Sequence, residues 1–304
     1  MAPGFQTFFQ QAGCDGELCV QSLDGANEVA ERADELVVAA SVIKVCVALE
    51  AETQFCEGRL NPADRVRLPA DRRTPGNVGF SLFDDDVEVS LRDLVVAMLT
   101  ISDNVATDAL LAAVGIDAVN AASARLGLSQ TVITSDIQTL VNSIWQEAGF
   151  AGWNAAMAWH AEPHSQSELD EVDEKWRAAP ALTAASSNRT TPRDMATLMR
   201  LIWTDQAGPQ PACARLRWIM SRQLTRHRLA SGFAPPARVA AKSGGLVGVV
   251  RNEVGVVTYP DGRGYAMAVF TQTQQPGRDA AINAVIGTVA AAAVQAMRGS
   301  SNDR

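Results

Sequence analysis

Apolar and polar residues alternate with a period of two near both ends of the chain and follow a helical period across its middle. Asp24-Gly25, a strong hairpin turn signal, separates the first two segments that read as strands. Three more such segments follow Ala234-Pro235-Pro236. The five predicted strands are 18–23, 28–33, 239–242, 248–258 and 265–271.

Helical patterns occupy the rest of the chain. They are predicted at 5–12 and 278–297, outside the strands, and in the middle at 42–55, 137–159 and 191–203. Two further helices, joined at Ser102-Asp103-Asn104, are predicted within 90–114. Strands near both termini that enclose a helical middle predict an α+β fold. We expect a five-stranded antiparallel sheet, flanked by the N- and C-terminal helices, built from residues 1–36 and 206–304. An inserted all-α domain would span residues 37–205.

Composition narrows the possible partners. The 304 residues carry a net charge of −8, and nucleic acid or an anionic membrane would require clustered positive charge. The first thirteen residues lack a secretory pattern, so we expect a cytoplasmic protein with small or neutral partners. The apolar stretch at 280–297 is interrupted by polar residues and predicts a buried helix rather than a membrane span. Five cysteines without a C-x-x-C pair indicate reduced thiols.

Lysine is rare in this sequence: only three occur, beside 23 arginines, and two of them lie in short motifs. The motifs are Ser41-Val42-Ile43-Lys44 and Lys242-Ser243-Gly244. A buried amine can lose its proton and act as a base, which a guanidinium cannot do. Ser-x-x-Lys places hydroxyl and amine on one helical face, although this spacing alone also suits a solvated pair.

A third motif, Ser102-Asp103-Asn104, lies between the first two at the junction of two predicted helices. Ser-x-x-Lys, Ser-Asp-Asn and Lys-Ser-Gly in this order resemble the motifs of class A β-lactamases and penicillin-binding proteins, in which the last often reads Lys-Thr-Gly. The phrases TISDNVATDALL and TTPRDMA and the paired C-terminal strands extend the resemblance over nearly the whole chain. A β-lactamase-like fold is therefore expected.

The resemblance implies a role for each motif residue. Ser41 would be the acylated nucleophile and Lys44 the acceptor of its proton. Ser102 would relay a proton to the leaving nitrogen, and Asn104 would hold the substrate amide. The backbone N–H groups of Ser41 and Gly245 would form the oxyanion hole.

The same resemblance places a substrate carboxylate at the third motif. Lys242, grouped with the catalytic residues, would bind that carboxylate together with Ser243. Arg251 follows on the next predicted strand, where many relatives keep an arginine that supports the carboxylate through a bidentate contact. The alternative for Arg251 is an ordinary surface arginine at a sheet edge.

The chain departs from class A enzymes in the segment that would activate the deacylating water. Where those enzymes carry a glutamate in an omega loop, this sequence reads SQTVITSDIQTL, without Arg-x-x-Glu. An insertion at about 132–185 replaces or displaces that loop, and its aromatic residues suggest a lid or a small core. Glu162 is a candidate for the displaced base, although an exposed loop carboxylate is the simpler interpretation. Asp136 and Glu147 are weaker candidates.

Histidines offer little alternative chemistry. His160 and His164 form an H-x-x-x-H pair, but Pro163 between them argues against the helix that would bring them together on a metal. His227 is the only other histidine, so a Ser-His-Asp triad has few possible members. We expect neither a metal nor a cofactor.

The sequence favours a serine hydrolase of class A β-lactamase type that forms an acyl-serine with a carboxylate-bearing lactam, amide or ester. The expected role is that of a biosynthetic or housekeeping esterase or amidase with weak β-lactamase activity. One alternative is a genuine β-lactamase with a displaced deacylating carboxylate. Another is a penicillin-binding sensor that does not turn over. The exact substrate and the oligomeric state stay open.

Overall fold

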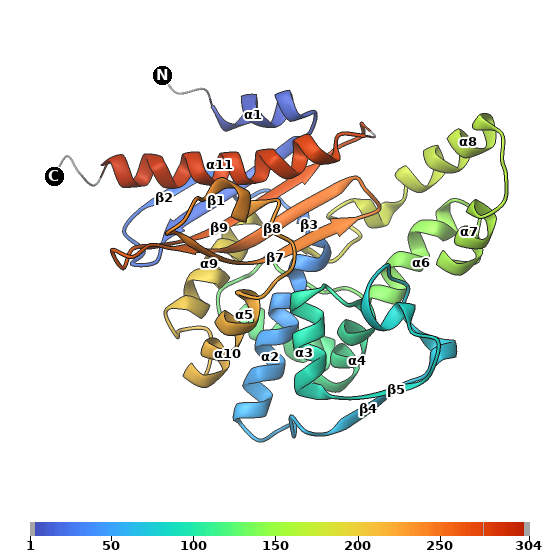
Figure 1. The fold of residues 1–304 in the computed structure, drawn as a ribbon, viewed down its shortest axis with the longest axis horizontal. Coiled ribbons are helices and arrows are strands. Elements are labelled where there is room, and N and C mark those ends of the chain that lie inside the picture. The colour runs from blue at the N-terminus through green and yellow to red at the C-terminus, as the bar shows by residue number, and fades with distance from the viewer. Residues whose placement is uncertain (1–3, 276, 301–304) are drawn as a thin grey trace.

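A five-stranded antiparallel sheet forms the centre of the protein (Figure 1). The structure is a computed structural model that describes residues 4–275 and 277–300. The strands lie in the order β2 (Glu28–Glu31), β1 (Asp15–Ser22), β9 (Gly264–Gln272), β8 (Val250–Thr258) and β7 (Arg238–Leu246). All neighbours are antiparallel, so the prediction of a five-stranded antiparallel sheet in an α+β fold is confirmed.

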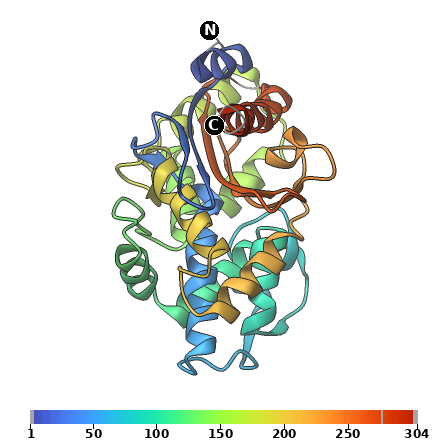
Figure 2. The same cartoon turned by 90° about the vertical axis from the view of Figure 1, so that its left-hand side faces the viewer.

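Helices cover both faces of the sheet, and the central strands are therefore apolar on both sides. α1 (Phe5–Ala12) and α11 (Asp279–Ser300) lie on one face, and α9 (Pro192–Trp203) lies on the other (Figures 1 and 2). Successive residues of β9 show the division: Met267 belongs to the apolar core under α11, whereas Ala268 belongs to the core on the α9 side.

α11 is long and apolar enough to span a membrane by length and composition alone, and half of its most apolar stretch is buried inside the molecule. Its apolar face, including Ile282, Ile286 and Val289, packs with Met267 and Val269 of the sheet. This packing accounts for the apolar stretch at 280–297, which the sequence predicted to be a buried helix.

α11 also approaches the backbone of η5 (Leu229–Gly232) closely at Gly287. A Cβ atom at Gly287 would lie 2.6 Å from the carbonyl oxygen of Arg228 and 2.8 Å from the amide nitrogen of Gly232. We expect Gly287→Ala to lower the free energy of unfolding by about 1–3 kcal/mol, because backbone must move to admit the methyl group. Thr288→Ala, on the exposed face of the helix, should change it by less than about 0.5 kcal/mol. Urea unfolding of both variants tests the contact, and equal stabilities would contradict it.

The middle of the chain is mainly helical and is organised around α2 (Lys44–Cys56), whose residues 44–54 are all buried. A helix that is buried on every side needs neighbours all round. These neighbours are α3 (Leu91–Thr100), α4 (Asn104–Val114), α5 (Ile116–Arg125) and α10 (Gln210–Met220). Two short antiparallel ribbons interrupt the helices, β3 (Val37–Val38) with β6 (Arg189–Thr190) and β4 (Arg65–Leu68) with β5 (Val87–Ser90).

The inserted segment forms three helices that project from one side of the molecule (Figure 1). The pattern at 137–159 is not one helix: it divides into α6 (Ile137–Glu147) and α7 (Trp153–His160), and α8 (Gln166–Arg177) follows. Gly149 and Gly152 take positive φ angles of 91° and 156° between α6 and α7, and such angles favour glycine and end the helix. Trp145 packs against Trp153 and Trp176, with ring centroids 5.9 and 6.3 Å away. The tryptophans therefore form a small core of this segment.

Candidate active site

Ser41 lies in the 3-10 turn η1 (Ala40–Ile43), immediately before α2. The preceding Ala40 has a φ of 47°, which is unusual for alanine and marks a backbone held by its surroundings. Asn252 of β8 provides one such restraint: its side-chain amide donates to the carbonyl oxygens of Val38 at 2.9 Å and Ala39 at 3.3 Å. The sheet thus fixes the segment that carries Ser41.

The Lys-Ser-Gly strand runs directly against this turn. A Cβ atom at Gly244 would lie 3.2 Å from the amide nitrogen of Val42 and 3.3 Å from the carbonyl oxygen of Ala39. Glycine at this position therefore lets β7 approach the backbone on either side of Ser41. The Ser41 hydroxyl is partly exposed and makes no hydrogen bond with the described residues, so it is free to meet a substrate.

The Ser-Asp-Asn motif links α3 to α4. Ser102 has a positive φ of 63°, which turns the chain between the two helices. Asp103 then caps α4, because its Oδ1 accepts a hydrogen bond from the amide of Ala106 at 2.9 Å, and its Oδ2 accepts one from Phe80 at 2.7 Å. Asp103 is thus a structural residue that fixes the backbone on which Ser102 and Asn104 lie.

Lys44 and Lys242 meet at the hydroxyl of Ser102. The Nζ atom of Lys44 lies 2.7 Å from the Ser102 carbonyl oxygen, 2.7 Å from Oδ1 of Asn104 and 3.4 Å from Oγ of Ser102. Nζ of Lys242 donates to the same Oγ at 2.9 Å. Two amines from distant parts of the sequence therefore flank one hydroxyl group.

Both lysines are fully buried, and burial disfavours their charged forms. Burial lowers the pKa of Lys44 to about 7, and the charges of Asp108 and Asp103 oppose that shift. The pKa of Lys242 is also lowered well below its usual value, first by burial and then by the charge of Lys44. Near neutral pH, Lys44 is thus close to the midpoint of its titration and can take up a proton.

The open edge of β7 provides backbone donors. The N–H of Ser243 points away from β8 and donates to the side-chain oxygen of Gln223. Residues two apart on a strand direct their N–H groups to the same side, so the N–H of Gly245 also lies on this edge. The Ser243 hydroxyl lies 3.3 Å from that of Thr225. The roles of Gly245 as an oxyanion donor and of Ser243 as a hydroxyl donor stay predictions.

Arg228 is a component of the site that the sequence did not reveal. Its buried guanidinium donates to the carbonyl oxygens of Gly244 at 2.6 Å and Asn252 at 2.8 Å, and to Asn283 Oδ1 at 2.8 Å. It therefore ties together β7, β8 and α11 behind the Lys-Ser-Gly motif. Arg228 lies in the irregular segment between α10 and β7, where no periodicity or motif distinguishes it from other arginines.

Arg251 lies opposite Gly245 in the β7–β8 pair and forms an ion pair with Asp279 of α11 at 2.5 Å. Its side chain is 15% exposed, so it is not a freely solvated surface arginine. Burial lowers the pKa of the neighbouring His227, and the charges of Arg228 and Arg251 lower it further. Positive charge is thus concentrated beside the Lys-Ser-Gly strand.

If Arg251 supports a substrate carboxylate, Arg251→Ala should slow acylation by carboxylate-bearing substrates by about 10-fold, while neutral esters are unaffected. Asp279→Asn is the matched control, because it removes the ion pair and keeps the guanidinium. Second-order acylation rates for a penicillin and for an uncharged phenyl ester would measure the difference. An equal loss with both substrates would contradict a role in binding the carboxylate.

The carboxylates near Lys44 are already occupied. Asp103 uses both oxygens in the contacts described above, and Asp108 accepts three hydrogen bonds on its two oxygens. These come from Thr74 Oγ1 at 2.7 Å, the amide of Ile137 at 2.8 Å and the amide of Gln138 at 3.0 Å. Asp108 thereby anchors the first turn of α6 to α4. Neither carboxylate is free to activate a water molecule.

The three carboxylates considered from the sequence lie elsewhere in the inserted segment. Asp136 caps α6 by accepting a hydrogen bond from the amide of Thr139 at 2.7 Å. Glu147 is exposed at the end of α6. Glu162 is exposed in the connection between α7 and α8. This connection lies at the outer edge of the molecule (Figure 1). Within the described residues, neither a hydrogen bond nor an ion pair joins any of them to Lys44 or Ser41.

The histidines make local contacts. His160 is the last residue of α7 and contacts the carbonyl oxygen of Ala156 at 2.8 Å, whereas His164 lies beyond the helix and stacks on Trp159. Their partners are thus backbone and aromatic groups. Across residues 4–275 and 277–300, no group of three or more His, Cys, Asp or Glu side chains is placed to hold a metal ion.

Comparison with known proteins identifies the family. The model of the beta-lactamase enzyme family matches residues 2–297. The beta-lactamase regulatory protein BlaB of Streptomyces cacaoi is 28% identical over 287 residues, which cover 89% of this chain and 90% of BlaB. A beta-lactamase from Sphaerobacter thermophilus has a TM-score of 0.74 at 24% identity, with 96% of this chain and 94% of that chain covered. A point mutant of PBP-A, solved as an acyl-enzyme complex with penicillin G, has a TM-score of 0.71 at 23% identity and 95% coverage of both chains. Because the family model spans almost its whole length, the chain belongs to the beta-lactamase enzyme family.

Proposed function

We propose that the protein is a serine hydrolase that acylates Ser41 with a small carboxylate-bearing lactam, amide or ester. The observation that carries this proposal is the Ser102 hydroxyl between the buried amines of Lys44 and Lys242, at 3.4 and 2.9 Å. Such an arrangement has little value for stability, because burying two amines is costly. It is useful for moving protons near a nucleophile, where perturbed pKa values are typical.

In the proposed acylation, neutral Lys44 takes the proton of Ser41, and the Ser41 oxygen attacks the substrate carbonyl carbon. The developing oxyanion accepts hydrogen bonds from the backbone N–H groups of Ser41 and Gly245. When the C–N or C–O bond to the leaving group breaks, Ser102 passes its hydroxyl proton to that group and is reprotonated from Lys44 or Lys242. Asn104 holds the substrate amide, and Lys242, Ser243 and Arg251 neutralise its carboxylate. The products are an acyl-Ser41 ester and the protonated leaving group.

In our proposal, hydrolysis of the acyl-Ser41 ester is slower than acylation of Ser41. A water molecule needs a base beside the ester, and the oxygens of Asp103 and Asp108 are committed to structural hydrogen bonds. This observation also supports a second candidate, a sensor that keeps its acyl group. The name of the 28% identical relative, a beta-lactamase regulatory protein, supports it as well. The third possibility, a genuine β-lactamase, would depend on the exposed Glu162.

Intact-protein mass spectrometry after mixing with benzylpenicillin, a chromogenic cephalosporin or an uncharged phenyl ester tests the proposal. We expect one acyl equivalent on Ser41 and none on Ser41→Ala. Slow loss of the adduct with repeated product release indicates a hydrolase, whereas a permanent adduct indicates the sensor. Rapid turnover that Glu162→Gln abolishes would indicate the β-lactamase. No adduct and no turnover with any substrate would contradict the acyl-serine proposal.

A further inference from the structure

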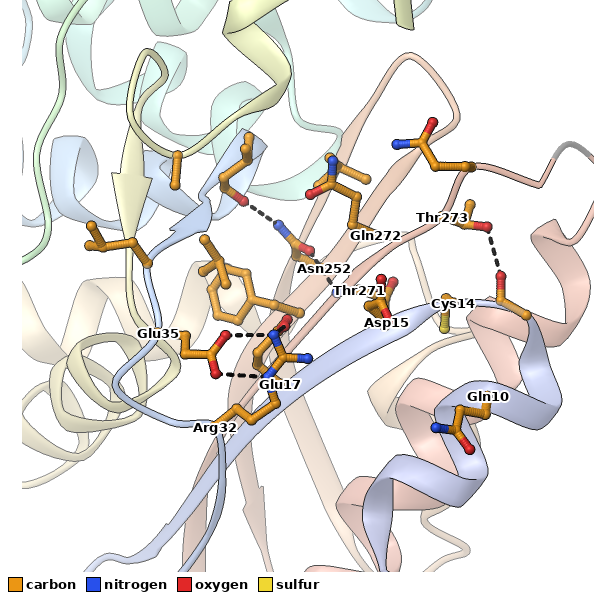
Figure 3. Close-up of a pocket in the computed structure, with 18 of the residues that line it drawn as sticks. Gln10, Cys14, Asp15, Glu17, Arg32, Glu35, Asn252, Thr271, Gln272 and Thr273 are labelled. Atoms are coloured by element: carbon orange, nitrogen blue, oxygen red, sulfur yellow. Dashed lines mark hydrogen bonds and ion pairs between the residues drawn. The ribbon is translucent and has the colours of Figure 1, made fainter. Parts of the chain in front are cut away.

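A cavity of about 600 Å³ opens beside the central sheet (Figure 3). It lies where the start of β1, the end of β9 and β3 come together, and the catalytic residues Ser41, Lys44, Ser102 and Lys242 do not line it. Its volume is within the range of small-molecule sites. The wall is rich in carboxylate, amide and hydroxyl groups, which indicates a polar ligand.

Negative charge predominates in this cavity. Among the described residues that line it, three carry carboxylates, Asp15, Glu17 and Glu35, and one, Arg32, is a cation. The Arg32 guanidinium is mainly engaged by Glu35, through contacts of 2.9 and 2.5 Å to the two carboxylate oxygens (Figure 3). It reaches only one oxygen of Glu17, at 3.3 Å. One guanidinium is therefore shared between two of the three carboxylates.

Glu17 is the least exposed of the three carboxylates. It is 8% exposed, and no hydrogen bond from the described residues reaches its carboxylate. A largely buried carboxylate with a single ion pair is costly, because little of its lost hydration is replaced. Burial accordingly raises the pKa of Glu17 to about 7, although Arg32 opposes the shift. A donor that carries positive charge, placed in the cavity, would satisfy this group.

The cavity also contacts the segment that holds the nucleophile. Asn252 and Val38 both line it, and the Asn252 amide donates to the carbonyl oxygens of Val38 and Ala39, directly before Ala40 and Ser41. On its other side, Oδ1 of Asn252 accepts a hydrogen bond from the amide of Thr271, a further lining residue, at 3.2 Å. A ligand that contacts Asn252 would therefore act on the backbone that positions Ser41.

We infer that this cavity is an effector site for a small polar molecule with a primary ammonium group, which binds against Glu17 and changes the reactivity of Ser41 through Asn252. The amide-rich wall, which includes Gln272 and Gln275, would hydrogen-bond the rest of such a molecule. The site lies apart from the proposed acylation chemistry, and its occupancy can be measured without any reaction at Ser41.

Disulfide tethering provides the test. Leu36 lines the cavity and is 46% exposed, so Leu36→Cys introduces an accessible thiol at its mouth. The variant is made with Cys56→Ser, since Cys56 is the one exposed thiol among the described cysteines. Cys14 also lines the cavity, but burial raises its pKa to about 12 and keeps it an unreactive thiol.

The introduced thiol is equilibrated with equal amounts of cystamine and 2-hydroxyethyl disulfide. The thiolate attacks one sulfur, forms a mixed disulfide and releases cysteamine or 2-mercaptoethanol, so the two labels compete and differ mainly in charge. We expect the aminoethyl label to predominate by about tenfold over the hydroxyethyl label. Thr288→Cys in the same Cys56→Ser background is the control, because it places a thiol on an exposed, uncharged part of α11.

Glu17→Gln should remove this preference, and Asp15→Asn should reduce it, while both variants keep their thermal unfolding temperature within a few degrees. The aminoethyl label should also change the acylation rate of Ser41 by at least about threefold relative to the hydroxyethyl label. Equal labelling at Leu36→Cys and Thr288→Cys would overturn the inference. A preference that leaves acylation unchanged would overturn the effector role.

Discussion

Lys44→Ala is expected to slow acylation of Ser41 by about 10²–10⁴-fold, the usual loss when a positioned base is removed. The physical reason is that Lys44, three residues after Ser41, is an amine whose pKa burial lowers to about 7, and the variant removes this neutral base. Lys242, which donates to the Ser102 hydroxyl, stays in place in this variant. Stopped-flow acylation with a chromogenic cephalosporin, combined with intact-protein mass spectrometry, would measure the loss.

Two control variants separate base chemistry from charge and folding. Lys44→Arg keeps a positive charge at this position but cannot act as a base, so it should be nearly as slow as Lys44→Ala. Lys175→Ala removes an exposed lysine of α8 that pairs with Glu171, and it should acylate at the normal rate. Near-normal acylation by Lys44→Ala at neutral pH would remove Lys44 from the mechanism.

The pH dependence follows from the same residue. Because burial lowers the pKa of Lys44 to about 7, the neutral, basic form increases as the pH rises through 7. The acylation rate constant should therefore increase between about pH 6 and 8 and then level off, and Lys44→Ala should lose this step. A wild-type rate that is independent of pH in this range would show that the neutral amine is not the active form.

Much of the fold was predictable because its determinants are local. The five strands and the helix at 278–297 follow from periodicity and from turn signals such as Asp24-Gly25, which depend on adjacent residues. The break between α6 and α7 depends on Gly149 and Gly152, and it was missed because isolated glycines do not always end a helix. The ribbon of β4 and β5 was missed as well, since four-residue strands carry little pattern.

The site was predictable only where residues form motifs. Ser41 and Lys44 were predicted from their spacing together with the two motifs that follow in order, Ser-Asp-Asn and Lys-Ser-Gly. Arg228 acts through its position behind Gly244, which no sequence pattern encodes. The same holds for Glu17, whose significance lies in its burial beside the cavity and its single ion pair with Arg32. Burial and hydrogen-bond or ion-pair partners are properties of the folded chain, so Arg228 and Glu17 could be recognised only in the structure.

Ile137→Glu is expected to shorten the lifetime of the acyl-Ser41 adduct by about 10²–10³-fold, by supplying the missing base. The amide of Ile137 donates to Asp108, whose charge acts on Lys44. The Ile137 side chain is buried in one apolar cluster with Val38 and Ala40, the residues that lead to Ser41. We expect a carboxylate at this position to face the segment that carries Ser41. The decay of the penicilloyl adduct, followed by mass spectrometry, measures the effect.

Two matched variants distinguish base catalysis by the new carboxylate from easier access of water after the apolar packing around residue 137 is disturbed. Ile137→Gln disturbs the same apolar packing, because glutamine has nearly the shape of glutamate, but its side chain cannot act as a base. Its acyl adduct should therefore persist as in the wild type. Gln138→Glu places a carboxylate one residue further along, on the exposed side of α6, and it should also have no effect. Faster decay in all three variants would mean that water access limits deacylation. Faster decay in Ile137→Glu alone would show that the site lacks only a base, and that the first turn of α6 decides whether this protein retains or releases its acyl group.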